Sequence, residues 1–503
     1  MLYVDKTRYI SKLADYGTYY FLSRPRRFGK SLFQDTLKEY FEGNRSLFSG
    51  LYIDREKPGE WPKHPVLRFD LSGNKYLDEG SIGRVLRKRL RTLEKSFGVE
   101  VEEEDDISIR FEELIEAVAG KTGSQVVVLI DEYDAPLSSA IDAPELHEAF
   151  RLELHGFYSV LKKCEEHIRF CFLTGVTRYG KVSVFSGINN LNDITFDDEY
   201  AGICGVTEDE LHEYYSEGVS EFAEKLEVKD EEAFRMLKYY YDGYHFTENL
   251  TDVYNPYSLN YALAKCKIKE YWCESGTPAL FTKMLMKMDF DIERLVGVTV
   301  KEKVLSNLSA FAKNPIPLFF QSGYLTLKSY DPESQMFTLG YPNREVESGI
   351  MSDILQTYNP TVDEGSEVLE RMKESLLVGN PEAFVGAIRV YLSQIPGPLK
   401  KRVARYENYY HTVIYCLLSL LGLETRAEFA TADGYIDLLI KTQKFIYVIE
   451  LKLNGTARDA MDQIKSKRYT DPFKLETKKL CMIAIGFSKE TKNISDYIID
   501  RGL

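Results

Sequence analysis

The sequence has no uninterrupted apolar run of about 18 residues, the length that a membrane-spanning helix needs, so we expect no membrane span. The residues after Met1 lack the basic segment and apolar core of a secretory signal, which favours a cytoplasmic protein. The seven cysteines occur singly and form no CxxC pair, and the seven histidines do not cluster with them. This spacing argues against a structural zinc site or a disulfide framework.

Net positive charge is also missing. The formal net charge of −14 argues against a protein whose whole surface coats nucleic acid. The charge is uneven, because residues 401–503 hold 17 Lys and Arg against 13 Asp and Glu, a net of +4, which leaves −18 for residues 1–400. A basic C-terminal segment is what a local phosphate-binding surface requires, although a run of charge is usually only a solvated face.

A candidate nucleotide-binding loop lies near the N-terminus. An apolar run at 18–22 predicts a buried strand, an amphipathic helix follows, and residues 23–31 between them read Ser-Arg-Pro-Arg-Arg-Phe-Gly-Lys-Ser. This is the order of a P-loop, in which backbone N–H groups hold phosphates, Lys30 reaches the β- and γ-phosphates of ATP, and the Ser31 hydroxyl ligates Mg²⁺. The candidate ATP-binding residues here are Arg26, Arg27, Phe28, Gly29, Lys30, Ser31 and Leu32.

One position departs from the usual GxxxxGK[ST] pattern. Arg24 stands where the first glycine is expected, so the loop must follow a different path. Together with Arg26 and Arg27, it adds cations beside the predicted phosphate site. A basic turn before an ordinary helix is the alternative interpretation of this motif taken alone.

A second motif supports nucleotide binding. Residues 125–130 form a continuous apolar run, typical of a central parallel strand, and end in Asp131 and Glu132. In this arrangement Asp131 holds Mg²⁺ and Glu132 polarises the attacking water. Two further strands are predicted at 66–71 and 168–173, and the latter ends at Thr174, where a hydroxyl can sense the γ-phosphate. Ligands bind beyond the carboxyl ends of such strands, so Lys30, Asp131 and Thr174 should converge.

Several segments resemble the AAA-ATPase-like family: Tyr3-Val-Asp-Lys-Thr7, Arg24-Pro-Arg-Arg-Phe-Gly-Lys30, Ile130-Asp-Glu-Tyr-Asp-Ala-Pro136, Thr174-Gly-Val-Thr177 and residues 184–195. Members are prokaryotic proteins with a PD-(D/E)XK nuclease domain at the C-terminus. The resemblance implies that arginine at position 24 is the family's own form of the loop. Family members usually carry a further short segment before the first of these motifs, so we expect a truncated or alternative N-terminus here.

From about residue 205 the pattern becomes helical, and Thr207-Glu-Asp-Glu210 is a capping box that predicts a helix start. A helical lid or linker packed on the ATPase is the expected role of this region. Its abundant aromatic residues favour core and interface over base stacking. Arg178 and Lys181 follow the strand at 168–173 and have two interpretations: contacts to nucleotide or a neighbouring subunit, or exposed loop charges.

The C-terminal hundred residues begin with a helix predicted over 400–421. Glu407 falls on its apolar stripe, where a carboxylate is costly unless it is paired or bound to a metal; a glutamate at the edge of the stripe, reaching solvent, is the alternative. Residues 434–440 and 445–452 then predict a β-hairpin.

The predicted hairpin brings two carboxylates and a lysine together. If Thr442 and Gln443 form a two-residue loop, Asp437 lies opposite Val448 and diagonal to Glu450. Glu450 and Lys452 share a face of their strand because side chains alternate. Oxygen ligands of this kind suit Mg²⁺ or Mn²⁺, with a backbone carbonyl as a further ligand, and Lys452 can orient a metal-bound hydroxide toward a phosphodiester.

These residues resemble the PD-(D/E)XK superfamily pattern, which Glu407, Asp437, Glu450-Leu451-Lys452, Gln463 and Tyr469 complete. The resemblance implies that Glu407, Asp437, Glu450, Lys452 and Gln463 are catalytic. It also implies that Asp437 and Glu450 hold the metal and that Lys467, Arg468 and Tyr469 lie near the phosphate backbone. Tyr435 replaces an arginine that relatives often have, which weakens the expected phosphate contact there.

We therefore predict an α/β protein of three domains. They are an ASCE/AAA-like P-loop ATPase with a parallel sheet at 1–205, a helical lid at 206–345, and a restriction-endonuclease-like domain at 346–503 with its core at about 400–490. The expected function is ATP binding and hydrolysis controlling a Mg²⁺- or Mn²⁺-dependent nuclease that acts on DNA or RNA. The alternative is a nucleotide-switched binding or signalling protein with an inactive nuclease-like domain. A homo-oligomer stays open because no arginine finger is identifiable.

Overall fold

The computed structural model describes residues 2–59, 61, 63–100, 106–179, 184–185, 188, 190–275, 292–306, 314–358, 367–395, 409–453, 455–488 and 490–502. The chain forms two compact units. The N-terminal unit comprises Met1–Trp272 and Gly297–Arg344, and the C-terminal unit comprises Cys273–Val296 and Glu345–Leu503. Residues 206–272 therefore belong to the same unit as residues 1–205, and the division into three domains stays a prediction.

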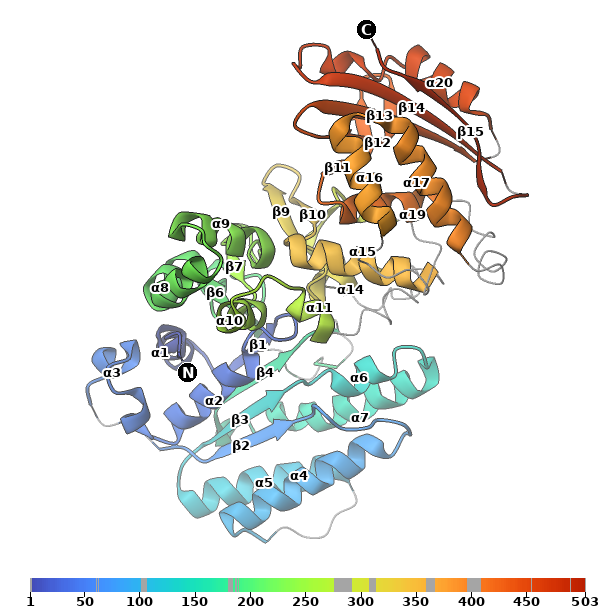
Figure 1. Ribbon diagram of the computed structural model, residues 1–503. Coiled ribbons are helices and arrows are strands. Elements are labelled where there is room, and N and C mark those ends of the chain that lie inside the picture. The colour runs from blue at the N-terminus through green and yellow to red at the C-terminus, as the bar shows by residue number, and fades with distance from the viewer. Residues whose placement is uncertain are drawn as a thin grey trace. The chain divides into compact units, whose positions relative to one another are not determined.

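The N-terminal unit is built on a five-stranded parallel sheet in the order β2-β3-β4-β1-β5, shown in Figure 1. The strands are β1 (Tyr19–Ser23), β2 (Val66–Asp70), β3 (Val126–Asp131), β4 (Ile168–Gly175) and β5 (Asn192–Asp193). β4 lies between the strand before the candidate loop and the strand with the acidic pair. Every residue of β1 and β3 is buried, which explains their continuous apolar runs. The predicted α/β class and parallel sheet are confirmed.

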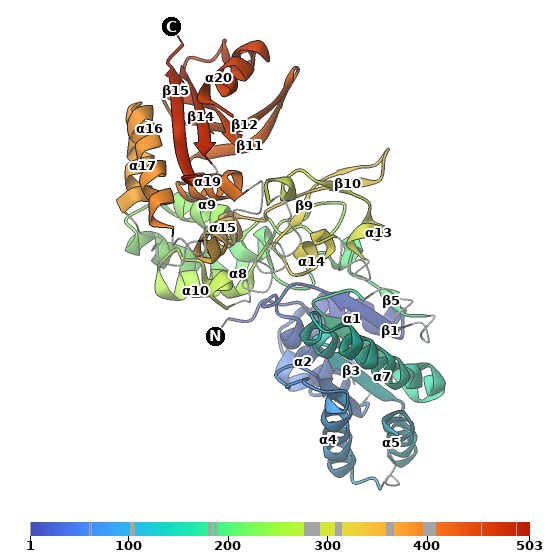
Figure 2. The same cartoon turned by 90° about the vertical axis from the view of Figure 1, so that its right-hand side faces the viewer.

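Helices cover this sheet and connect its strands. They are α1 (Thr7–Tyr16), α2 (Lys30–Phe41), α3 (Tyr52–Glu56), α4 (Ser81–Phe97), α5 (Ile107–Thr122), α6 (Ala135–Ser139) and α7 (Pro144–Lys163). α2 follows β1 directly and packs against β3, so the loop between β1 and α2 stands at the carboxyl edge of the sheet. α4, α5 and α7 contact one another. Figure 2 shows α4 and α5 at the lower end of that view, with α7 above them.

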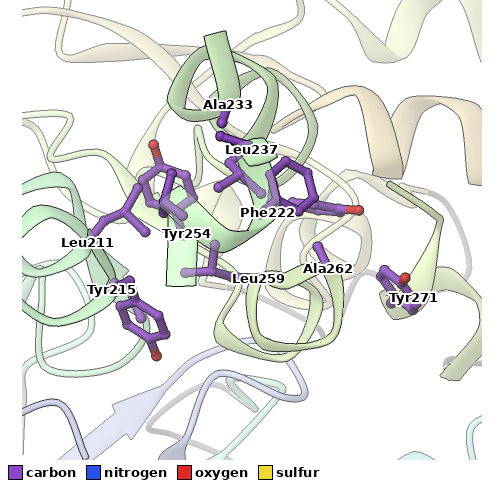
Figure 3. Close-up of a cluster of buried hydrophobic side chains, with 13 residues drawn as sticks. Leu211, Tyr215, Phe222, Ala233, Leu237, Tyr254, Leu259, Ala262 and Tyr271 are labelled. Atoms are coloured by element: carbon purple, nitrogen blue, oxygen red, sulfur yellow. The ribbon is translucent and has the colours of Figure 1, made fainter. Parts of the chain in front are cut away.

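The remaining part of the N-terminal unit is mainly helical. It contains β6 (Val206–Thr207), α8 (Glu208–Lys225), α9 (Asp230–Tyr241), β7 (Val253–Tyr254), α10 (Pro256–Lys265), β8 (Thr299–Val300), α13 (Glu302–Leu305), α14 (Ile316–Gln321), β9 (Thr326–Asp331) and β10 (Met336–Gly340). The short helix α11 (Tyr271–Ser275) begins in this unit and ends in residues assigned to the C-terminal unit. The predicted capping box is confirmed, since Thr207 and Glu210 exchange both of its hydrogen bonds at the start of α8. Figure 3 shows the apolar core shared by α8, α9 and α10, with Phe222, Leu237 and Leu259 at its centre.

Aromatic residues of this region serve mainly as core. Tyr241, Tyr244 and Phe246 are buried, whereas Tyr239 is 60% exposed.

The C-terminal unit holds a mixed sheet in the order β11-β12-β13-β14-β15. Its elements are α15 (Arg344–Tyr358), α16 (Glu367–Val378), α17 (Pro381–Gln394), α19 (Tyr409–Leu420), β11 (Glu424–Thr431), β12 (Gly434–Lys441), β13 (Phe445–Leu453), α20 (Ala457–Ser466), β14 (Lys479–Ser488) and β15 (Asn493–Asp500). Only β13 and β14 run parallel. Val448 packs under α20, and the hydroxyl of its neighbour Tyr447 donates to the Leu376 carbonyl of α16, so helices cover both faces.

Among the helices that the structure describes, none combines the length and the apolar character needed to cross a membrane.

Candidate functional sites

The loop between β1 and α2 contains two left-handed backbone positions. Gly29 has a φ of 95° and Arg27 a φ of 68°, a conformation uncommon for a residue with a side chain and typical of functional loops. α2 begins at Lys30, directly after Gly29. The first N–H groups of a helix have no carbonyl acceptor within it, so here they point toward the loop and favour the binding of an anion. Exposed residues at this edge are Arg26, Arg27, Gly29, Ser31 and Leu32.

The Lys30 side chain is buried and turns back over its own loop. Its Nζ donates to the carbonyls of Arg24 at 3.0 Å and Pro25 at 3.1 Å, and lies 3.9 Å from Oε1 of Glu132. The structure thus brings the predicted phosphate-binding lysine next to the predicted water-activating carboxylate.

Arg24 points into the protein and not toward the phosphate site. Its side chain is 1% exposed and donates to three carbonyls, those of Ser23 and Thr195 at 2.9 Å and that of Tyr200 at 3.1 Å. The guanidinium also stacks 4.2 Å over the ring of Phe246, and burial lowers its pKa to about 10. Arg24 is therefore a brace behind the loop, and the expectation of an extra cation beside the phosphates is wrong for this residue.

The loop is also held by residues of the helical region, which the sequence analysis treated as a separate lid. The Phe28 ring is buried and meets the Tyr244 ring edge-on at 4.8 Å, and the Phe28 carbonyl accepts from the Gly205 N–H at 2.9 Å. The indole N–H of Trp272 donates to the Arg26 carbonyl at 3.1 Å. The Phe28 side chain thus anchors the loop to the helical region.

Asp131 and Thr174 meet across neighbouring strands. The register of β3 and β4 places them level, and the Thr174 hydroxyl donates to Oδ1 of Asp131 at 2.7 Å. Gln34 completes the group, because its amide donates to Thr174 Oγ1 at 3.1 Å and to the Ile130 carbonyl at 2.9 Å. Sequence reasoning missed Gln34; the available signal was its position one helical turn after Lys30.

Glu132 is held in a strained conformation. Its φ is 52°, and its N–H donates to Oδ1 of Asp131 at 3.0 Å. Burial raises the pKa of Glu132; Asp134 and Asp131 add to the rise, while Lys30 opposes it. A carboxyl with a raised pKa is suited to accept a proton near neutral pH.

The rest of the acidic motif ties down the turn after β4. Asp134 accepts from the N–H groups of Val176 at 3.2 Å and Thr177 at 2.7 Å, and from the Thr177 hydroxyl. Gly175 is needed for this close approach, since a Cβ there would lie 2.4 Å from Asp134 Oδ1. Asp134 thus fixes the strand end that carries Thr174.

Arg178 matches neither predicted role. Its NH2 lies 2.5 Å from Oδ2 of Asp193, its NH1 donates to Ser306 Oγ at 2.7 Å, and its side chain is 14% exposed. These contacts make it a buried ion-pair partner inside the N-terminal unit. Lys181 lies outside the described residues.

The loop of the C-terminal hairpin has an even number of residues, which Asp437, Glu450 and Lys452 require to lie on one face of the sheet. The register of its two strands differs from the prediction. Lys441 pairs with Ile446, and the Thr442 N–H donates to the Phe445 carbonyl at 2.9 Å, so the turn lies at 443–444 and not at 442–443. Continued past Leu438 and Ile449, this register places Asp437 directly opposite Glu450. The predicted partner of Asp437, Val448, lies two residues earlier in the chain, so the expected diagonal placement is wrong. The turn is shifted because the Thr442 hydroxyl caps it by accepting from two N–H groups.

Asp437, Glu450 and Lys452 meet as predicted. Oδ2 of Asp437 accepts from the Leu451 N–H at 2.7 Å, and Lys452 Nζ donates to Oε1 of Glu450 at 3.1 Å. Glu450 is fully buried, and its second oxygen, Oε2, has no hydrogen-bond partner among the described residues. Burial and the charge of Asp437 raise the pKa of Glu450 to about 7, and burial also raises the pKa of Asp437.

Gln463 and Tyr469 lie beside this pair. Gln463 Nε2 donates to the Tyr469 hydroxyl at 3.3 Å. Burial raises the pKa of that tyrosine, and the charges of Glu450 and Asp437 add to the rise. Gly434 gives it room, because a Cβ there would lie 2.9 Å from the Tyr469 hydroxyl. Lys467 and Arg468 are exposed, and Arg468 pairs with Asp471 at 2.7 Å.

The donor set fits a hard cation. A buried carboxylate oxygen without a partner, beside a second carboxylate, is costly unless a cation is bound. The described residues contain no group of three or more His, Cys, Asp or Glu side chains able to hold a metal, so Asp437 and Glu450 would need further oxygen ligands, such as backbone carbonyls or water, to hold Mg²⁺. Glu407 lies outside the described residues. His411, which sequence reasoning missed, acts electrostatically on Asp437 from α19.

Comparison with known proteins agrees with the two predicted domain types. Residues 1–185 match the family model of a predicted AAA-ATPase, and residues 405–497 match that of the PD-(D/E)XK nuclease superfamily. An uncharacterized protein from the vnfD 5′ region of Azotobacter chroococcum mcd 1 is 33% identical over 506 residues, which cover 99% of this chain and 95% of that protein. Membership implies a nucleotide and a divalent metal, and a nuclease domain implies nucleic acid. The chain belongs to the AAA-ATPase-like family and carries a PD-(D/E)XK nuclease superfamily domain toward its C-terminus.

Proposed function

We propose that this protein binds and hydrolyses ATP at the Lys30 loop and cleaves DNA or RNA at Asp437, Glu450 and Lys452, with the nucleotide state regulating cleavage. The observation that carries the nuclease proposal is the fully buried Glu450, whose unpartnered oxygen lies on the strand face that also carries Asp437 and Lys452. Such a face is stable only when a cation or a proton neutralises it.

At the ATP site, the chain supplies binding and water activation. The N–H groups at the start of α2 and the Lys30 ammonium hold the phosphates, while Ser31 and Asp131 hold the Mg²⁺ that accompanies ATP and neutralises its charge. Glu132 accepts a proton from the attacking water, which its raised pKa favours. Thr174, held by Gln34, hydrogen-bonds near the γ-phosphate.

At the nuclease site, Asp437 and Glu450 hold Mg²⁺ or Mn²⁺, which when bound supplies Lewis acidity and an activated water. Lys452 stabilises the negative charge that builds on the attacked phosphate. Gln463 positions the Tyr469 hydroxyl beside the carboxylates. Glu407 and Gln463 complete the proposed catalytic set. We propose that the chain comprises three domains, at residues 1–205, 206–345 and 346–503.

The test is a cleavage assay on the full chain with DNA and RNA, with Mg²⁺ or Mn²⁺, with and without ATP. Asp437→Asn should abolish cleavage, whereas Asp433→Asn, an exposed carboxylate on the neighbouring turn, should not. Lys30→Ala should weaken ATP binding, whereas Lys38→Ala, a surface ion-pair residue on the same helix, should not.

The second candidate is a nucleotide-switched binding or signalling protein with an inactive nuclease-like domain. The exposed Tyr435, 60% accessible, favours it, because it offers no charge to a phosphate where relatives often have arginine. ATP-sensitive binding of nucleic acid without cleavage under any metal condition would establish this alternative.

A further inference from the structure

Helix α4 of the N-terminal unit carries charge of almost one sign. It contains six cations, Arg84, Arg87, Lys88, Arg89, Arg91 and Lys95, and one anion, Glu94. The chain as a whole has a net charge of −14, so this helix is a local exception. Exposed helix faces usually mix both signs because like charges three or four residues apart repel.

The anion does not neutralise the cations of its own helix. Glu94 is buried, and its two carboxylate oxygens accept from Nε and NH2 of Arg110 on α5, each at 2.8 Å. It continues the inward stripe of Ile82, Leu86 and Leu90, which are at most 1% exposed and attach α4 to the rest of the unit. The helix is thus held by its apolar face, and the outer face is left to the cations.

The outer cations follow one line. Arg84, Lys88, Arg91 and Lys95 recur at steps of four, three and four residues and are all exposed, so they form a stripe of about 16 Å along the helix. A groove of about 380 Å³ is lined by these four residues with Arg87 and Thr92. Figure 1 shows α4 alongside α5, below β2 in that view.

Neighbouring acids neutralise only part of this face. Arg84 pairs with the exposed Asp78 at 2.7 Å, and Arg87 acts electrostatically on Glu153 of α7. Within the part of the chain that the structure describes, no ion pair is formed by Lys88 or Lys95. Lys88 and Lys95 therefore keep the outer face of α4 positively charged.

We propose that this stripe, Arg84, Lys88, Arg91 and Lys95, is a second nucleic-acid contact, which binds the phosphodiester backbone without reading sequence. A repeating anion of matching length is the partner that such a row of point charges and forked guanidinium groups fits. The choice of nucleic acid over an acidic protein rests on the proposed nuclease function, whose substrate has this backbone. The stripe would place nucleic acid on the ATPase part of the chain as well as on the nuclease.

The test measures binding of the full chain to labelled duplex DNA, duplex RNA and single-stranded DNA in EDTA, across a range of salt. The variant replaces Arg84, Lys88, Arg91 and Lys95 with glutamine. A matched control replaces Lys75, Lys225, Lys229 and Lys267, four exposed lysines elsewhere in the N-terminal unit, so that both proteins lose the same charge. Unchanged ATP affinity shows that each variant is folded.

We expect the stripe variant to bind duplex DNA about tenfold more weakly at about 0.1 M salt, and its log–log salt slope to fall by about 3 to 4, since each phosphate contact contributes about 0.9. The control should keep the affinity and slope of the unmodified chain. If the unmodified chain, the stripe variant and the control all keep the same preference between DNA and RNA, that preference comes from the nuclease domain and the stripe binds the backbone without selecting between them. Equal affinity of the stripe variant and the control would overturn the proposal, while metal-dependent cleavage by that variant would leave the nuclease proposal intact.

Discussion

Asp242 gives the sharpest prediction about stability. This carboxylate follows α9 and is 1% exposed. The ammonium nitrogen of Lys238 lies 3.5 Å from its Oδ2. Burial raises the pKa of Asp242 to about 7; Asp252 and Glu208 add to the rise, while Lys238 and the Gly243 N–H oppose it. Lys328, on the neighbouring strand β9, also interacts electrostatically with Asp242. The folded state therefore holds a proton that the unfolded chain releases at about pH 4.

An acid whose pKa is raised by folding costs no stability below the pKa of the unfolded chain, and its cost grows until the pH passes the folded pKa. For values of about 7 and about 3.9, ionisation costs about 1.5 kcal/mol at pH 5 and about 4 kcal/mol at pH 8, a difference of about 2.5 kcal/mol. Lys238 is 48% exposed and can move closer to the ionised carboxylate, which reduces this figure. We take about 1 kcal/mol as the lower bound.

Asp242→Asn removes this ionisation. The variant should therefore gain at least about 1 kcal/mol more in unfolding free energy, relative to the unmodified chain, at pH 8 than at pH 5. Denaturant titration followed by tryptophan fluorescence measures this, because both tryptophans, Trp61 and Trp272, belong to the N-terminal unit.

Asp209→Asn, at an exposed position of α8, is the matched control and should act equally at both pH values. An Asp242→Asn effect that is also the same at both values would refute the reasoning.

Two other predictions concern the ATP site. Arg24→Gly, which restores the usual P-loop glycine, should destabilise the N-terminal unit by about 2 to 4 kcal/mol in denaturant titrations, because three buried carbonyls lose their donor; unchanged or higher stability would contradict the assigned brace. Thr174→Val should lower the ATP turnover number severalfold or more and change ATP affinity little, since it removes the hydroxyl bonded to Asp131 but no phosphate-binding N–H. An equal loss of affinity and turnover would point to a binding role instead.

Sequence reasoning located the strands and helix around the candidate ATP site because their signals are local. A buried strand, a loop and a helix must follow one another for the Lys30 loop to form, and the apolar run before Asp131 leaves little choice but a central strand. The parity of the C-terminal hairpin was also predictable, since alternation along a strand depends only on even or odd spacing.

The contacts that sequence reasoning missed join residues far apart in the chain. Arg24 finds its acceptors at Thr195 and Tyr200, and Arg178 finds Asp193 and Ser306, so neither partner set is visible from neighbouring residues. The error in the predicted register of the hairpin has a local cause. Thr442 can belong to the turn or to the strand, and only its capping hydrogen bonds decide.

The Trp272 contact suggests how nucleotide state reaches the nuclease. Trp272 is the last residue of the N-terminal unit before the chain continues into the C-terminal unit at Cys273, and its indole N–H donates to the Arg26 carbonyl of the nucleotide loop. We infer that, if ATP binding changes the path of this loop, the change reaches the chain that continues at Cys273.

Trp272→Phe keeps a ring but removes this donor. If the hydrogen bond transmits nucleotide state, the variant should bind ATP within about threefold of the unmodified chain, since one neutral hydrogen bond contributes roughly 1 kcal/mol or less. Its rate of nucleic-acid cleavage should no longer respond to ATP. Trp61→Phe, which alters a tryptophan whose indole donates to Lys57, is the control and should leave that response intact. A Trp272→Phe protein with full ATP dependence would show that coupling takes another route, because the direct link from loop to connecting chain would then be dispensable.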